Sequence, residues 1–144
     1  MQVQAFSVRR VREATIPYQG DRVRGPADAA KVLHGLLGDY DREAAAVLAL
    51  DTKHRPIGIH IVSVGTLDGA TLHPREVYKF AILCSAAAIM LGHNHPSGDP
   101  TPSPDDISVT RRLREAGELL GIRLLDHIIV TGDPAVWTSA AEPR

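Results

Sequence analysis

Residues 86–106 read Ala-Ala-Ala-Ile-Met-Leu-Gly-His-Asn-His-Pro-Ser-Gly-Asp-Pro-Thr-Pro-Ser-Pro-Asp-Asp, and this stretch decides how the rest of the chain is interpreted. The apolar run from Ala86 to Leu91 predicts a short buried strand. His93 and His95 follow it, and side chains two positions apart in extended backbone point the same way. Pro96 stops the strand at once. We therefore expect two imidazoles to leave the strand end side by side.

A carboxylate follows this histidine pair at the start of the next helix, where Asp106 stands eleven residues after His95. Two neutral imidazoles and one carboxylate, with a fourth position open, are typical of a catalytic zinc site. The sequence therefore predicts that His93, His95 and Asp106 hold one Zn²⁺ ion. A second interpretation explains Ser103 and Asp106 without a metal, as the N-cap and third residue of a helix that begins at Pro104. The two interpretations are compatible, since a capped helix start is a rigid mount for a ligand.

The spacing from His93 and His95 to Ser103 and Asp106 resembles the JAMM (MPN-plus, JAB-type) metalloprotease signature in residue type and separation. Further segments make the chain similar to the bacterial RadC family, once called a DNA repair family, from about residue 27 to residue 130. These segments begin at His73, Gly92, Thr110 and Leu124. The helix-hairpin-helix segment that precedes this domain in longer RadC proteins is expected to be absent.

The resemblance implies a fold and a chemistry. The fold is the JAB/MPN fold, a three-layer α/β sandwich like that of the cytidine deaminases. The activity is that of a zinc metallopeptidase, which cleaves a peptide or isopeptide bond with metal-activated water, and Ser103 is implied to support the tetrahedral intermediate. Two alternatives stay open: a DNA-associated repair or recombination accessory protein or metal-dependent nuclease, and a metal-bound scaffold without turnover.

A general base for the water has two candidates among the glutamates. Glu43 stands just before the first buried strand, where JAMM enzymes also carry their motif glutamate, and it is the better match. Glu76 begins a helix, where its charge suits the helix dipole without any catalytic role. His127 lies on an apolar strand, where a hydrogen-bonded core residue is the more frequent case. If His127 has a function, it is to orient a metal ligand.

Composition describes an ordinary soluble domain of 144 residues, 44% hydrophobic and 23% charged. The formal net charge of -1 gives no general attraction to nucleic acid. No apolar run approaches the length of a membrane span, and the N-terminus lacks a signal-peptide pattern. Cys84 is the single cysteine, so an internal disulfide is excluded. We therefore expect a cytoplasmic protein without membrane contact that takes a peptide or protein substrate, and the oligomeric state stays open.

Residues 1–26 are predicted to be a partly basic extension of a RadC-like domain at residues 27–140. Within the extension, five arginines stand against two acids, Glu13 and Asp21. Such an arm could contact phosphate and bind nucleic acid weakly. A solvated extension that packs loosely on the domain is the favoured interpretation.

Alternating helical and extended patterns complete the prediction. Residues 44–50 form a strand buried on both faces, and 56–64 pair with it as an antiparallel hairpin, with Ile57, Ile59 and Ile61 on one side. A loop at 65–70 follows. Helices are expected near 26–37, 73–86 and 104–120, the last with Leu119 and Leu120 inward and Gly121 as its cap. Strands at 123–130 and 135–139 close the chain. The fold class is therefore α/β, a mixed β-sheet flanked by helices.

Overall fold

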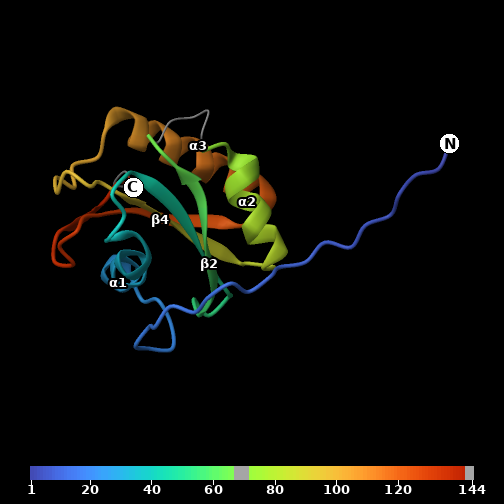
Figure 1. Ribbon diagram of the computed structural model, residues 1–144, viewed down its shortest axis with the longest axis horizontal. Helices are drawn as coiled ribbons and strands as arrows, with labels where there is room; N and C mark the ends of the chain where they lie inside the picture. The colour runs from blue at the N-terminus through green and yellow to red at the C-terminus, as the bar shows by residue number, and fades with distance from the viewer. Residues whose placement is uncertain (67–71, 142–144) are drawn as a thin grey trace.

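The computed structural model describes residues 1–66 and 72–141, and in them one five-stranded sheet runs in the order β2-β1-β3-β4-β5 (Figure 1). The elements are α1 (Pro26–Leu37), β1 (Ala44–Leu50), β2 (Pro56–Val64), α2 (Pro74–Leu83), β3 (Ala88–Asn94), α3 (Pro104–Leu120), β4 (Arg123–Val130) and β5 (Trp137–Ser139). β3 and β4 are parallel, and the other neighbouring strands are antiparallel. The predicted mixed sheet and the predicted hairpin of β1 and β2 are confirmed. The predicted loop at 65–70 lies partly outside the described residues.

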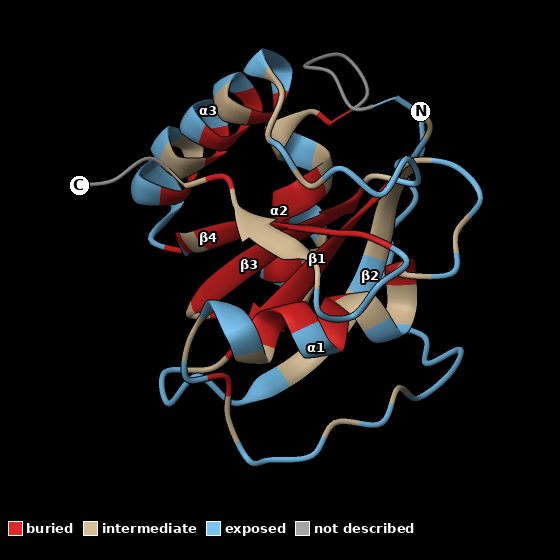
Figure 2. Cartoon of the chain, turned by 90° about the vertical axis from the view of Figure 1, so that its left-hand side faces the viewer, coloured by how far each residue is buried: buried red, intermediate tan, exposed pale blue. Residues whose placement is uncertain are grey.

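Helices cover both faces of the sheet, which makes three layers. α1 lies on one face, while α2 and α3 lie together on the other (Figure 1). Each face has its own apolar cluster, and β1 and β3 between them are coloured as buried in Figure 2, whereas the edge strands β2 and β5 are not. The predicted α/β sandwich is confirmed, and it places the start of α3 near the end of β3.

β1 and β3 are the centre of this arrangement because both are buried along their whole length. Ala46 and Leu48 face the α1 cluster, while Ala45 and Val47 face the α2 and α3 cluster. The apolar run of β1 therefore meets a helix layer on each side, as predicted. Gly92 of β3 allows α1 to pack directly on the sheet, since a Cβ at this position would collide with the Leu33 side chain.

The sequence prediction for β2 was wrong in one respect. Ile59 and Ile61 pack toward the α1 cluster, whereas Ile57 packs toward the opposite cluster. Irregular pairing explains the difference, because the register steps from Gly58 to Pro56 and from Ser63 to Ile61. A residue inserted at a bulge turns its side chain to the other face of the sheet. Val62, the other skipped residue, packs against the same cluster as Ile57.

Several predicted boundaries and orientations also need correction. α2 ends at Leu83 rather than near residue 86, because Ser85 adopts a left-handed backbone with φ 51°. β3 begins later and continues through Asn94, so His93 belongs to the strand itself. Leu119 and Leu120 are exposed, because the buried stripe of α3 runs through other positions. That stripe consists of Asp106, Val109, Thr110, Leu113 and Gly117.

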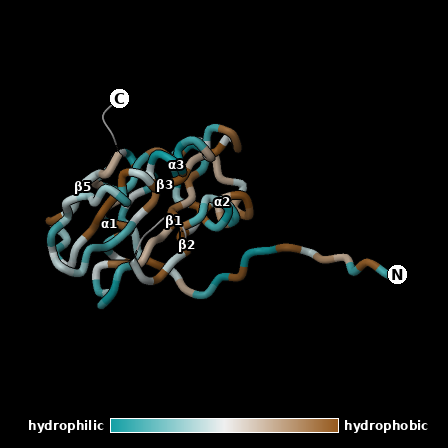
Figure 3. Tube along the Cα trace, turned by 90° about the horizontal axis from the view of Figure 1, so that it is seen from above, coloured by the Kyte–Doolittle hydropathy of each residue, from teal (hydrophilic) through white to brown (hydrophobic). Residues whose placement is uncertain are grey.

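The N-terminal segment of residues 1–15 is exposed and contains no helix or strand. Figure 3 shows it leaving the domain as an extended arm that carries both hydrophobic and hydrophilic residues. The proposed division at residue 26 stays a prediction. Among the described residues, no helix has the length and apolar character needed to span a membrane.

Candidate metal centre

Four side chains meet where β3 ends and β1 begins. His93 lies near the end of β3, and His95 follows directly after that strand. Because β1 runs antiparallel to β3, it starts where β3 ends, and Glu43 immediately precedes it. Asp106 comes from the first turn of α3. Topology alone thus brings together residues that are up to 63 positions apart in the sequence.

The two histidines lie side by side. Their ring centroids are 4.6 Å apart, and the rings are nearly perpendicular. His93 continues the row of Ile89 and Leu91, which face the apolar cluster under α2 and α3. The side chain of His93 is 1% exposed and that of His95 is 13% exposed. The two histidines therefore follow a row of buried apolar side chains at the end of β3.

Carboxylate oxygens surround this pair at nearly equal distances. Asp106 Oδ1 lies 3.4 Å from His93 Nδ1, and Asp106 Oδ2 lies 3.3 Å from His95 Nε2. Glu43 Oε1 lies 3.4 Å from His93 Nε2. Neither contact of His93 has hydrogen-bond geometry, so both of its buried nitrogens lack a hydrogen-bond partner. Ligands at about 2.0–2.1 Å from a tetrahedral ion stand about 3.3–3.4 Å apart, so each contact has the separation of a ligand pair. Because Asp106 and Glu43 contact different nitrogens of His93, these contacts do not all belong to one ion.

The tautomer of His95 also fits a metal. Its Nδ1 lies 2.8 Å from the backbone carbonyl oxygen of Asp99. A carbonyl oxygen can only accept, so His95 carries its proton on Nδ1. The lone pair of a neutral ring is then on Nε2, which faces Asp106. Metal-ligating histidines commonly donate their second N–H to a backbone carbonyl in this way.

Asp106 is fixed by the helix start that carries it. Its backbone N–H donates to Ser103 Oγ at 3.0 Å, and its Oδ2 accepts from the Ser103 N–H at 2.8 Å. This reciprocal pair is a capping box, with Pro104 at the first helical position. The predicted helix cap is therefore present, and the carboxylate that it anchors contacts both histidines. Asp106 therefore belongs both to the capping box of α3 and to the group of side chains around the histidines.

A second layer of buried polar groups lies behind His93. The ring of His127 is 5.8 Å from that of His93. Thr110 Oγ1 donates to the Asp106 carbonyl at 2.7 Å and lies 2.7 Å from His127 Nδ1. The hydroxyl has one proton, so Nδ1 of His127 must donate to it, and the lone pair on His127 Nε2 stays without a partner. The sequence prediction of a hydrogen-bonded core histidine describes this arrangement, with the site next to it.

Burial keeps these imidazoles neutral. It lowers the pKa of His93, although the Asp106 carboxylate acts in the opposite direction. It lowers the pKa of His127 to about 3. A histidine must be neutral to offer a nitrogen lone pair to a metal, so the lowered pKa of His93 favours metal binding near neutral pH.

One set of three residues has the geometry to hold an ion here. Glu43, His93 and His95 each offer one ligand atom, and these atoms lie within 4.8 Å of one another. Asp106, the predicted third ligand, lies outside this set, although its two carboxylate oxygens each contact one of the histidines. The described residues thus contain a candidate metal site formed by Glu43, His93 and His95, and the ligand role of Asp106 stays a prediction.

Glu76, the alternative base, is placed elsewhere. It lies in the first turn of α2, and its Oε2 pairs with Lys79 Nζ at 2.8 Å. That hydrogen bond lowers the pKa of the Glu76 carboxyl. His73 caps the same helix by accepting from the Arg75 N–H. The segment around Glu76 therefore starts a helix, as its charge and position indicated.

Two residues near the site were not identified from the sequence. Asn94 is 2% exposed and uses its amide to bind the backbone on both sides of Glu43. Thr110 links the helix that carries Asp106 to His127. A polar residue on an otherwise apolar strand or helix face was the available signal, because a buried polar group needs a partner.

Similarity to known proteins shows the family of the chain. Residues 23–143 match the RadC-like JAB domain. A UPF0758 protein of Desulforudis audaxviator is 54% identical over 108 residues, which are 75% of this chain and 47% of that protein. A UPF0758 protein of Moorella thermoacetica is 55% identical over the same shares. One of Alkaliphilus oremlandii is 48% identical over 123 residues, 85% of this chain and 52% of that protein. The chain thus spans about half the length of these curated relatives.

Proposed function

The chain belongs to the RadC family and carries its JAB domain, and from this premise we propose that it is a zinc-dependent hydrolase that cleaves a peptide or isopeptide bond. The observation that carries the proposal is the set of contacts at 3.3–3.4 Å around the buried His93 and the partly buried His95, with both nitrogens of His93 lacking a hydrogen-bond partner. Imidazole and carboxylate ligands at this spacing suit zinc, and three protein ligands leave a position open for water.

We assign His93, His95 and Asp106 as the ligands and Glu43 as the base. Asp106 is buried, and the capping box fixes it between the two histidines. The Glu43 side chain is 30% exposed, so substrate and water can reach it. This combination supports a fixed ligand and an accessible proton acceptor. Glu76, which is engaged with Lys79, has no part in the assignment.

The chemistry divides between the ion and the protein. When bound, zinc would polarise a carbonyl group and lower the pKa of a coordinated water toward about 7. Glu43 would accept the proton of the attacking water and return it to the leaving nitrogen as the C–N bond breaks. The products are a carboxylic acid and an amine, so protons and atoms balance.

Ser103 is the proposed donor to the substrate oxygen. Its Oγ already accepts the Asp106 N–H, so its hydroxyl proton is available to another acceptor. A donor aimed at developing negative charge is worth about 3 kcal/mol in such reactions. Ser103 would thus cap the helix and stabilise the tetrahedral intermediate with one side chain.

The substrate is proposed from the reaction, and the partners are proposed from the sequence. A peptide or protein substrate follows from the proposed reaction. Contact of the arginine-rich N-terminal arm with nucleic acid, and with it a DNA-associated role, stays a prediction. A cytoplasmic location is an expectation of the same kind.

A cleavage screen with matched variants tests the proposal. Chain loaded with Zn²⁺ is incubated with a library of internally quenched fluorogenic peptides. Wild type should cleave part of the library only when zinc is present. Glu43→Gln should retain zinc and lose about 10²–10⁴-fold in turnover, whereas Glu76→Gln should keep wild-type turnover. Zinc-independent cleavage, or loss of turnover in Glu76→Gln alone, would contradict the assignment.

A further inference from the structure

Asn94 stands between the two histidines in sequence but faces the other side of the sheet. Alternation along β3 puts Leu91 and His93 on the α2 and α3 side. Asn94 follows the phase of Met90, which faces α1. The side chain is 2% exposed. A buried primary amide must satisfy both a donor and an acceptor, so its partners indicate what it holds.

Both partners are backbone groups on either side of Glu43. Asn94 Oδ1 accepts from the Ala44 N–H at 2.7 Å, and Asn94 Nδ2 donates to the Arg42 carbonyl at 3.0 Å. The carbonyl of Glu43 itself accepts from the Gly65 N–H at 2.7 Å. Three hydrogen bonds therefore fix the backbone of residues 42–44.

The strand register explains why a side chain does this work. The pairing of β1 with β3 runs from Leu50 opposite Ala88 to Ala45 opposite His93. Just past the last of these pairs, the Asn94 amide presents one acceptor and one donor, as a peptide group of the ladder would. The backbone is thus hydrogen-bonded on both sides of Glu43, just before β1 begins.

We propose that Asn94 is a positioning residue that holds the Glu43 carboxylate against His93, an inference that rests on the proposed function. Glu43 Oε1 lies 3.4 Å from His93 Nε2, and the 30% exposure of the side chain means that its placement depends on its backbone. A displacement of about 1 Å in such a group can cost about 10²-fold in rate. Asn94 therefore couples the strand that carries the histidines to the residue that acts on them.

A metal-binding cycle tests this coupling without a substrate. Co²⁺ is added to metal-free wild type, Asn94→Ala, Glu43→Gln and the double variant, and the visible absorption spectrum of each complex is recorded at one pH. Asn94→Ala should bind one equivalent of Co²⁺ and show the spectral change of Glu43→Gln. The double variant should show no further change. Asn94→Ser, which retains a small polar group, provides the same comparison if the alanine variant does not fold.

A matched control separates positioning from general destabilisation. Tyr78→Phe removes another buried hydrogen bond, from Tyr78 Oη to the Leu113 carbonyl, and should leave the Co²⁺ spectrum unchanged. Amide hydrogen exchange of metal-free protein gives a second readout. The Ala44 amide should exchange about five- to tenfold faster in Asn94→Ala and at the wild-type rate in Tyr78→Phe.

The outcomes are distinguishable. An unchanged spectrum in Asn94→Ala, additive changes in the double variant, a Glu43→Gln spectrum identical to wild type, or unchanged Ala44 exchange would each overturn the positioning role. Failure of wild type to bind Co²⁺ would overturn the proposed function instead. In that case the Ala44 exchange rate still decides whether Asn94 holds this backbone.

Discussion

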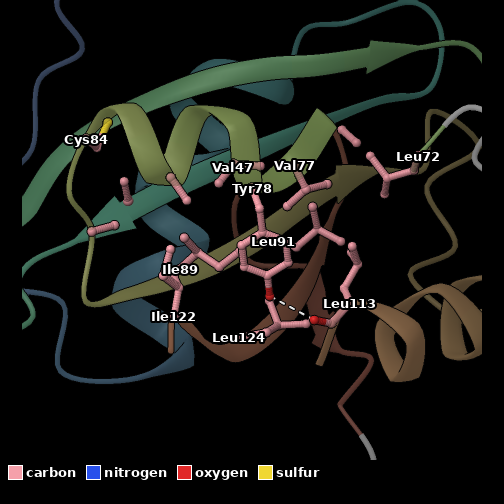
Figure 4. Close-up of a cluster of buried hydrophobic side chains, with 14 of the residues drawn as sticks. Val47, Leu72, Val77, Tyr78, Cys84, Ile89, Leu91, Leu113, Ile122 and Leu124 are labelled. Atoms are coloured by element: carbon pink, nitrogen blue, oxygen red, sulfur yellow. Dashed lines mark hydrogen bonds between the residues drawn. The ribbon is translucent and has the colours of Figure 1, made fainter. Parts of the chain in front are cut away.

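Along one face of the sheet, the buried polar group beside the inner half of β3 has a hydrogen-bond partner, whereas imidazole nitrogens near its outer end lack one. The inner half contributes Ile89 and Leu91 to an apolar cluster whose one tyrosine, Tyr78, donates its hydroxyl to the Leu113 carbonyl at 2.8 Å (Figure 4). At the outer end, His93 is equally buried, and it lies beside the buried His127 of the neighbouring strand β4. These two rings leave three imidazole nitrogens without partners. Unpaired buried polar atoms are costly. The difference indicates that the inner half is built for stability and the outer end for binding.

The strongest test of this division compares two residues of one capping box. Asp106→Ala removes the carboxylate that contacts both histidines, so the variant should lose most of its bound zinc. Ser103→Ala should keep the zinc, lose about 1 kcal/mol of stability with the cap, and slow turnover by about 10²-fold. Metal analysis, urea unfolding and the cleavage assay check these results. Equal zinc content in the two variants would count against the ligand assignment.

The inner half should show the reverse behaviour. Leu113 is fully buried in the apolar cluster, so Leu113→Ala should lower the free energy of unfolding by about 2–5 kcal/mol. Its zinc content should equal that of wild type below the melting temperature. Urea unfolding and metal analysis measure the two quantities. Loss of zinc together with stability would show that the two halves are not separable.

In metal-free protein, ionisable groups of the two regions should lower the stability of the fold at opposite ends of the pH scale. Burial lowers the pKa of His127 from 6.5 to about 3, so the unfolded chain binds a proton first as the pH falls. Stability should therefore decline below about pH 6.5. Burial raises the pKa of Tyr78 from 10.0 to about 12, so the unfolded chain ionises first and stability should decline above about pH 10.

Urea unfolding of two variants across the pH range checks this contrast. His127→Leu should make the acid side of the profile shallower, and Tyr78→Phe should do so on the alkaline side. An effect of His127→Leu on the alkaline side, or of Tyr78→Phe on the acid side, would show that the two regions are not independent.

The features of the fold that the sequence predicted are those encoded by local signals. The apolar run of β1 predicted a strand buried on both faces, and Ser103, Pro104 and Gly121 marked the ends of α3, because these signals are local. The bulge at Ile57 depends on how β2 pairs with β1, so its reversed side chain could not be read from alternation. Leu119 is exposed because the α3 stripe is set by its contact with the sheet.

The candidate site shows a similar limit. His93, His95 and Asp106 carry a recognisable spacing, so their convergence could be expected from the chain alone. Asn94 binds the residues around Glu43, fifty positions earlier in the sequence, and only the register of β1 against β3 brings them together. The partnership of Thr110 with His127 likewise depends on α3 crossing over β4.

The ligand set is tested most directly by metal analysis of the chain, after incubation with Zn²⁺ and removal of the excess, beside His93→Ala treated in the same way. We predict about one zinc per chain in wild type and essentially none in the variant, because His93 contacts both carboxylates of the cluster. A wild-type chain without zinc, or a variant that retains as much zinc as wild type, would contradict the central claim.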